Sequence, residues 1–227
     1  MSARRWMAAS CMVVAVSACG APDVRQGGEG TDAATIAAGS DAVTAVYECP
    51  GGSGFVARIQ GDTAWLFLPG RTVPVFRTPS ASGAKYADSA VTYWSHGDEA
   101  TIEAPELSAR ECRNNRRAAI WEHAKLNGVD FRAVGNEPGW FLEIRRGRTI
   151  VFVTDYGQVR YEFPAPEPEV DQDGARAVYR TGDDDHELVV RLELRRCLDS
   201  MADDEYETTV AVTFDARELR GCGRPLH

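Results

Sequence analysis

From residue 43 onwards, the sequence is a succession of short runs in which apolar and polar side chains alternate. The runs 55–59, 188–195 and 206–214 show this alternation, and turn-forming residues lie between many of the runs. A period of two is that of a β-strand with one buried face. Many short strands at close spacing predict an all-β protein, built as a sandwich or a small barrel.

One segment breaks the alternating pattern. Residues 114–125 have the composition of a short helix, and Asn127-Gly128 can end it. Trp121 in this segment is expected to pack against a neighbouring part of the fold. We therefore predict a first β-domain over residues 43–115, a helical connector over 116–128 and a second β-rich domain over 129–227.

The first 19 residues have the pattern of an export signal. Two arginines precede an apolar stretch, Met7 to Ala18, that is too short to span a bilayer as a stable helix. Val16-Ser17-Ala18-Cys19 is similar to the bacterial lipoprotein signal box, which implies that Cys19 is lipidated and begins the mature chain. The alternative is a plain secretory signal with an incidental cysteine. In both cases the chain leaves the cytoplasm.

The residues after Cys19 indicate where the mature chain is held. By analogy with lipoproteins, Gly20 in place of an aspartate favours the outer membrane, with the protein facing the periplasm. Several acyl chains would anchor it stably. Residues 20–42 are rich in small and polar residues and have no apolar period, so they are predicted to be a flexible tether.

Six cysteines occur in the chain, and four of them lie beyond the predicted signal and lipidation site. Export to an oxidising compartment makes disulfides their expected state, and four cysteines allow three connectivities. We predict the sequential pairs Cys49–Cys112 and Cys197–Cys222, because each pair brackets one predicted domain. A metal site would need more closely spaced ligands than these.

The formal net charge of −9 disfavours nucleic acid and anionic membrane surfaces as electrostatic partners and favours a basic protein. The acidic runs 183–185 and 203–205 lack the spacing of a calcium loop and are predicted to be solvated turns. Ser82 is not in a Gly-x-Ser-x-Gly elbow, and the four histidines are scattered. We expect no enzymatic activity, no metal and no cofactor.

The stretch from Ser80 to Ala100 is the most informative part of the chain. Its first residues are small, so the backbone can bend tightly and approach a partner closely. Residues 91–94 alternate as a strand does, and His96-Gly97-Asp98 predicts a turn into the next strand. Such a low-bulk loop held by a rigid sheet is a common place for binding residues. The aromatic residues of this domain are expected to form its core or wall rather than a ligand platform: Trp65, Phe67, Tyr93 and Trp94.

The blocks Ser80-Ala-Ser-Gly-Ala-Lys-Tyr86 and Trp94-Ser-His-Gly-Asp-Glu-Ala100 resemble the signature of the MliC-type membrane-bound inhibitors of c-type lysozyme. The resemblance covers about residues 45–115. It implies a small antiparallel β-barrel whose loop enters the lysozyme cleft, with the Ser82 hydroxyl near the two catalytic carboxylates and Tyr86 bracing the loop. The lysozyme-binding residues that it implies are Ser80, Ser82, Gly83, Lys85, Tyr86 and His96.

One position departs from that family. His96 stands where family members commonly have a lysine, so its charge at neutral pH differs. In the second domain, Gly135–Trp140, Cys197–Met201 and Gly221–Gly223 resemble a group of bacterial envelope proteins without an assigned activity, which adds a fold expectation only. The sequence therefore predicts a lipid-anchored lysozyme inhibitor, and the alternative is a structural or scaffolding envelope lipoprotein.

Overall fold

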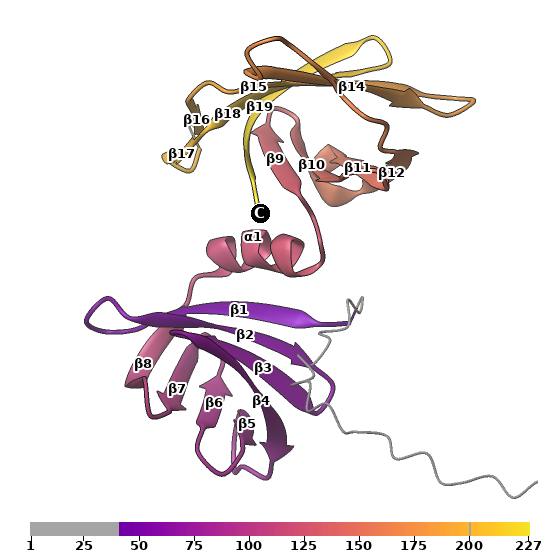
Figure 1. Ribbon diagram of the computed structural model, residues 1–227. Coiled ribbons are helices and arrows are strands. Elements are labelled where there is room, and N and C mark those ends of the chain that lie inside the picture. Colours follow the sequence, from indigo (N-terminus) through magenta and orange to yellow (C-terminus); the bar gives the residue numbers. More distant parts are fainter. Residues whose placement is uncertain (1–40, 200) are drawn as a thin grey trace, which may run out of the picture. The chain divides into compact units, whose positions relative to one another are not determined.

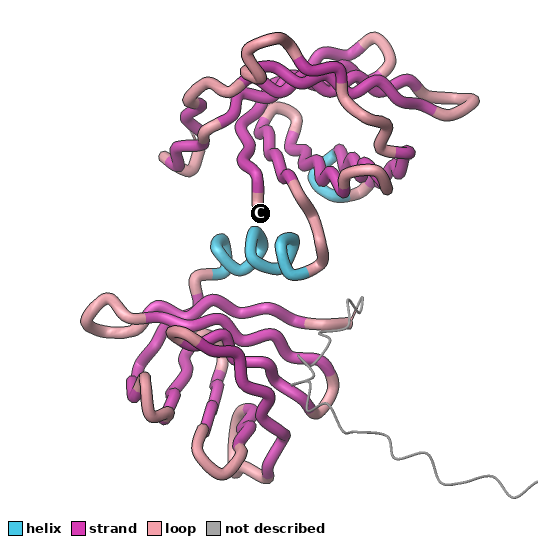
Figure 2. The backbone as a smooth tube through the Cα atoms, in the orientation of Figure 1, coloured by secondary structure: helices cyan, strands magenta, loops and turns pink. Residues whose placement is uncertain are grey.

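The computed structural model describes residues 41–199 and 201–227. The predicted signal, Cys19 with its predicted lipid and residues 20–40 of the predicted tether lie outside the described residues. The described residues are mostly strands, with one α-helix (Figures 1 and 2). The prediction of an all-β protein with a short helical connector is confirmed.

Eight antiparallel strands close into a barrel, which confirms the architecture that the resemblance implied. They are β1 (Val43–Glu48), β2 (Gly54–Gln60), β3 (Thr63–Leu68), β4 (Arg71–Thr78), β5 (Ala84–Ala87), β6 (Thr92–His96), β7 (Glu99–Glu103) and β8 (Ser108–Asn114). Each strand pairs with its neighbour in sequence, and β1 also pairs with β8. Closure removes the free edges that an open sheet would expose.

The inside of the barrel is filled by aromatic and aliphatic side chains from alternate strand positions. Tyr47 stacks on Phe55 with 5.0 Å between ring centroids, and Tyr93 contacts both rings. The Tyr47 and Tyr93 hydroxyls are hydrogen-bonded to each other at 3.0 Å, so these buried polar groups are satisfied. The predicted disulfide Cys49–Cys112 is present and connects the chain just after β1 to β8.

The second part is a nine-stranded antiparallel sheet in the order β12-β11-β10-β9-β19-β18-β15-β14-β13, with a separate hairpin of β16 and β17. The strands are β9 (Phe131–Asn136), β10 (Gly139–Arg145), β11 (Thr149–Thr154), β12 (Val159–Pro164), β13 (Glu169–Val170), β14 (Arg176–Gly182), β15 (Glu187–Glu193), β16 (Cys197–Asp199), β17 (Asp204–Tyr206), β18 (Thr208–Phe214) and β19 (Arg217–Pro225). A 3-10 turn, η1 (Asp155–Gly157), follows β11. The sheet is curled, and its core includes Trp140, Phe152, Phe163 and Phe214.

Two predictions about this sheet have different outcomes. The disulfide Cys197–Cys222 is present and joins β16 to β19, as predicted. The acidic run 183–185 lies in the turn between β14 and β15. In the run 203–205, however, Asp204 and Glu205 lie in β17 and form ion pairs with Arg117 and Arg196, so this run is only partly a turn.

The helix α1 (Arg116–Leu126) lies where the connector was predicted. The Asn115 side chain accepts a hydrogen bond from the Ala118 N–H and caps its first turn, and Gly128 follows its end with φ +73°. Trp121 is buried and packs on Tyr206 of β17, with 5.2 Å between ring centroids. The helix therefore does more than connect, because its buried side packs against the fold.

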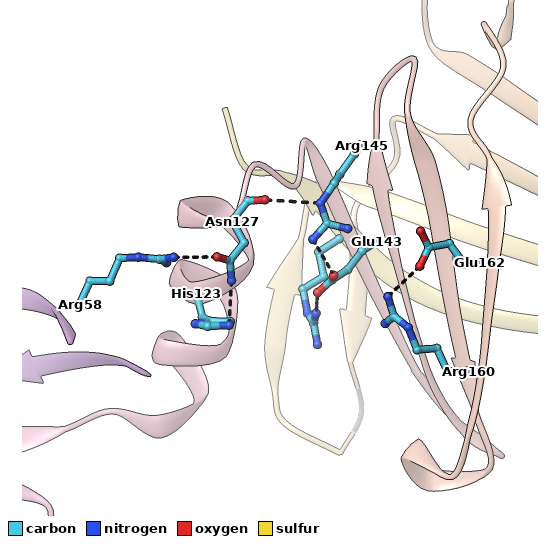
Figure 3. Close-up of polar contacts among 8 residues, drawn as sticks. Arg58, His123, Asn127, Glu143, Arg145, Arg160 and Glu162 are labelled. Carbon is cyan, nitrogen blue, oxygen red and sulfur yellow. Dashed lines mark hydrogen bonds and ion pairs between the residues drawn. The ribbon is translucent and has the colours of Figure 1, made fainter. Parts of the chain in front are cut away.

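A chain of hydrogen bonds joins α1 to the outer wall of the barrel (Figure 3). His123 Nδ1 lies 3.1 Å from Thr44 Oγ1, and His123 Nε2 lies 2.8 Å from Asn127 Nδ2. Arg58 Nη2 donates to Asn127 Oδ1 at 2.8 Å. Because a guanidinium only donates, the Asn127 amide nitrogen must point at His123 and donate to it. His123 is therefore neutral in this arrangement, with its proton on Nδ1.

This network predicts that stability falls in mild acid. Burial, the Arg58 charge and the Arg132 charge lower the pKa of His123, against a raising effect of Glu143. The unfolded chain then binds the proton first, so the His123 contribution is complete above pH ~6.5 and is lost as pH falls through the folded-state pKa. Urea unfolding from pH ~8 to ~5 should show a smaller stability loss in His123→Gln than in wild type. Parallel pH profiles would contradict the assigned protonation state.

Candidate functional site

The small-residue loop connects β4 to β5, and Ser80 to Gly83 in it are exposed. The loop is shorter than predicted, because β5 begins at Ala84 and takes Lys85 and Tyr86 into the sheet. Lys85 pairs with Thr78 on one side and with Trp94 on the other. Within this segment, the residues that lie outside the sheet and can project from the barrel are therefore Ser80 to Gly83.

Three contacts fix the loop. The Trp94 indole Nε1 donates to the Ser82 carbonyl oxygen at 2.8 Å, and the Ser80 hydroxyl donates to the Gly83 carbonyl oxygen at 3.2 Å. Gly83 has φ +67°, and a Cβ there would lie 2.2 Å from the Ser95 carbonyl oxygen. Glycine is thus required for both the backbone conformation and the close approach of β6. The loop is held in one shape before any partner arrives.

Tyr86 supports this end of the barrel from within. Its side chain is 2% exposed and stacks on Tyr93, with 5.9 Å between ring centroids. Arg77 Nη1 donates to the Tyr86 hydroxyl at 3.2 Å, and its guanidinium lies over the ring at 5.7 Å. This placement fits the bracing role implied for Tyr86. Its side chain is not exposed for direct contact with a partner.

Ser82 and His96 come together at the rim of one shallow groove of about 410 Å³. His96 is exposed at the end of β6, next to the predicted turn at Gly97. The groove is also lined by Trp94, Glu99, Thr101, Arg110 and Glu111. Arg113 pairs with Glu99 at 3.0 Å and Arg110 with Glu103 at 3.6 Å, all on exposed side chains. Such pairs contribute little stability and can rearrange when a charged partner binds.

The groove offers hydroxyl, imidazole, guanidinium and carboxylate groups that can form hydrogen bonds. No hydrogen bond among the described residues joins the Ser82 hydroxyl to His96, the contact that a serine nucleophile would need. Within residues 41–199 and 201–227, no group of three or more His, Cys, Asp or Glu side chains could hold a metal ion. The Ser82 hydroxyl remains available as a donor or acceptor for a partner.

Sequence reasoning missed the role of Trp94. It was expected in the core or wall, and it does lie in the barrel wall on β6, but the alternation of this strand turns Tyr93 inward and Trp94 outward, where it is 42% exposed. There it both lines the groove and holds the loop. The alternation of Val91 and Tyr93 with Thr92 and Trp94 was the signal that could have placed it.

The candidate site is thus a low-bulk loop beside a groove on a closed eight-stranded barrel. Residues 47–108 match the family model of the membrane-bound lysozyme inhibitors of c-type lysozyme, MliC. The match extends from the end of β1 to the start of β8 and includes the loop and the groove. It confirms the resemblance for this segment, and the family is one of inhibitors and not of enzymes.

Among curated proteins and among solved structures, none matches the chain. In the described part of the chain, no helix has the length and apolar character needed to cross a membrane.

Two glycine substitutions test how tightly the loop is fixed. Gly83 and Gly97 both have positive φ, at +67° and +60°, but a Cβ at Gly97 meets nothing within 4 Å. Gly97→Ala should therefore lower the free energy of unfolding by about 1 kcal/mol, the cost of the left-handed backbone. Gly83→Ala must also displace the Ser95 carbonyl and should cost at least about 1 kcal/mol more. Equal losses in urea denaturation would contradict the close approach.

Proposed function

We propose that this protein is a lipid-anchored inhibitor of c-type lysozyme that places the Ser80–Tyr86 segment, led by Ser80 to Gly83, in the lysozyme active-site cleft. The observation that carries the proposal is the match of residues 47–108 to the inhibitor family, which includes this loop. The alternative, a structural or scaffolding lipoprotein, has no comparable observation in its favour.

The proposed mechanism is occupation of the cleft. Lysozyme needs two carboxyl groups and the space between them to cleave a glycosidic bond. A small loop can enter that space, and the Ser82 hydroxyl can donate a hydrogen bond to a carboxylate there. Because Trp94 and Gly83 already hold the loop, little ordering entropy is lost on binding. Inhibition then needs no covalent step.

Charge supports a basic partner. The chain carries a formal net charge of −9, which favours association with a positively charged protein and makes its rate sensitive to salt. Lys85, at the base of the loop, and His96, across the groove, are the basic residues proposed to face the acidic cleft. Ser80 and Gly83 set the conformation of the loop.

The remaining parts of the proposal concern location and organisation. Lipid on Cys19 would hold the protein at the outer membrane, facing the periplasm, and residues 20–42 would let the folded part reach its target. We take residues 43–115 as the inhibitor domain, 116–128 as the connector and 129–227 as a further domain. A family described as membrane-bound supports association with the cell envelope.

Substitution of Ser82 tests loop insertion. Ser82→Tyr adds a ring to the tip that is proposed to enter the cleft and should weaken inhibition of c-type lysozyme by about tenfold or more, which corresponds to about 1.4 kcal/mol. Ser89→Tyr is the matched control, because Ser89 is also exposed but lies at the opposite end of β5. Equal inhibition constants for both folded variants would contradict insertion of this loop.

The histidine at the family's lysine position predicts a pH dependence. A histidine ordinarily carries charge only below about pH 6.5, and a facing carboxylate stabilises the charged form. Binding energy from His96 is then present in acid and is lost as pH rises, so inhibition should be stronger near pH ~5.5 than near pH ~8.

His96→Lys controls for titration of lysozyme itself. The lysine stays charged over this range, so the variant should bind more tightly at the higher pH and show a flatter profile. Inhibition constants for both proteins across the range provide the measurement. If the two profiles coincide, His96 does not face the cleft.

A further inference from the structure

A second cleft, of about 940 Å³, is lined by other residues than the groove beside the loop. Its walls come from α1, from β9, β10 and β12, and from barrel residues that include Val43 and Asp98. The arginines in its lining are Arg116, Arg132, Arg145 and Arg160, and the carboxylates are Asp98 and Glu143. In a chain of net charge −9, this excess of positive charge is unusual.

The carboxylates do not neutralise the cleft. Arg116 binds Asp98 through two hydrogen bonds of 2.9 Å, which satisfies that pair. Arg132 and Arg145 share the single carboxylate of Glu143, and Arg132 makes the close contact. In the part of the chain that the structure describes, two guanidinium groups thus share the carboxylate of Glu143.

The hydrogen-bond donors of Arg145 make only long contacts with the protein. Its Nη2 lies 3.7 Å from Glu143 Oε2, and its Nε lies 3.4 Å from the Asn127 carbonyl oxygen (Figure 3). Both distances are longer than a normal charge-assisted hydrogen bond. The side chain is 20% exposed, so a ligand can reach it. Its planar fork suits the two oxygens of a carboxylate or phosphate.

Two buried arginines add to the positive potential. Arg58 is fully buried behind His123 and Asn127, which line the cleft, and its Nε and Nη1 have no hydrogen-bond partner in the described part of the chain. Arg132 is 7% exposed, and its Nε is also without a partner there. A buried charge without a counter-charge is costly, and a nearby anion lowers that cost.

We propose that this cleft binds a small organic oxyanion, a carboxylate or a phosphate group, with Arg145 as its bidentate partner. Arg160 stands at the open side of the cleft, where its guanidinium, 56% exposed and paired with Glu162, contributes further charge. Ile120, 52% exposed, and Phe141, over which Arg132 stacks at 4.5 Å, offer an apolar surface to the rest of the ligand. This site is independent of the proposed inhibition of lysozyme.

Calorimetric titration of the purified protein with inorganic phosphate, and separately with acetate, tests the site at constant ionic strength. We expect saturable binding of at least one anion, and which one binds distinguishes a phosphate-bearing from a carboxylate-bearing ligand. Arg145→Gln should weaken this binding by at least about tenfold. Arg145→Lys keeps the charge but loses the fork, so its affinity should be intermediate.

Arg180→Gln is the matched control. Arg180 is an arginine of β14 whose side chain is 55% exposed and pairs with Glu169 outside this cleft, so its removal should leave anion binding unchanged. If Arg145→Gln does not fold, Arg160→Gln takes its place and should weaken binding severalfold. Absence of saturable binding by wild type, or equal affinity in the cleft variants and the control, would overturn the proposal. Inhibition of lysozyme should be the same in all these variants.

Discussion

The closure of β1 on β8 is the constraint on which the candidate site depends. Tyr47 and Glu48 pair with Asn114 and Arg113, and the Cys49–Cys112 disulfide covalently links the same two ends. In the unfolded chain this cross-link removes conformations, which favours the folded state. With the barrel closed, the registers of β4, β5 and β6 are fixed. The loop between β4 and β5 is therefore carried by a frame that cannot open at an edge.

The conformation of the candidate site comes from the barrel that supports it and not from unusual residues. Serine, alanine and glycine have no strong chemistry, but Trp94 and the Ser95 carbonyl leave them one conformation. A fixed loop loses little entropy on binding, and its low bulk allows it to enter a narrow cleft. The same frame supports α1, whose His123 and Asn127 connect the barrel wall at Arg58 to the region of Arg145.

Local pattern was enough to predict much of this fold. Alternation and turns predicted the strands, and export predicted the two disulfides. Local pattern failed where a contact from another part of the chain decides the structure of a residue. Lys85 and Tyr86 looked like loop residues, but pairing with Trp94 and Tyr93 draws them into β5. Arg58 alternates with apolar residues and has the pattern of a wet face, yet it is fully buried and donates to Asn127, just after α1. No pattern within β2 indicates that Arg58 will contact a segment some 60 residues later in the chain.

We propose that the folded protein binds c-type lysozyme through the loop end of its barrel. The test is a titration of purified c-type lysozyme with the purified wild-type protein. Calorimetry measures the binding, and hydrolysis of cell-wall substrate measures the remaining lysozyme activity. We expect saturable binding with one protein per lysozyme and loss of hydrolysis in proportion to the complex formed. Full lysozyme activity in the presence of a large excess of folded protein, with no heat of binding, would contradict it.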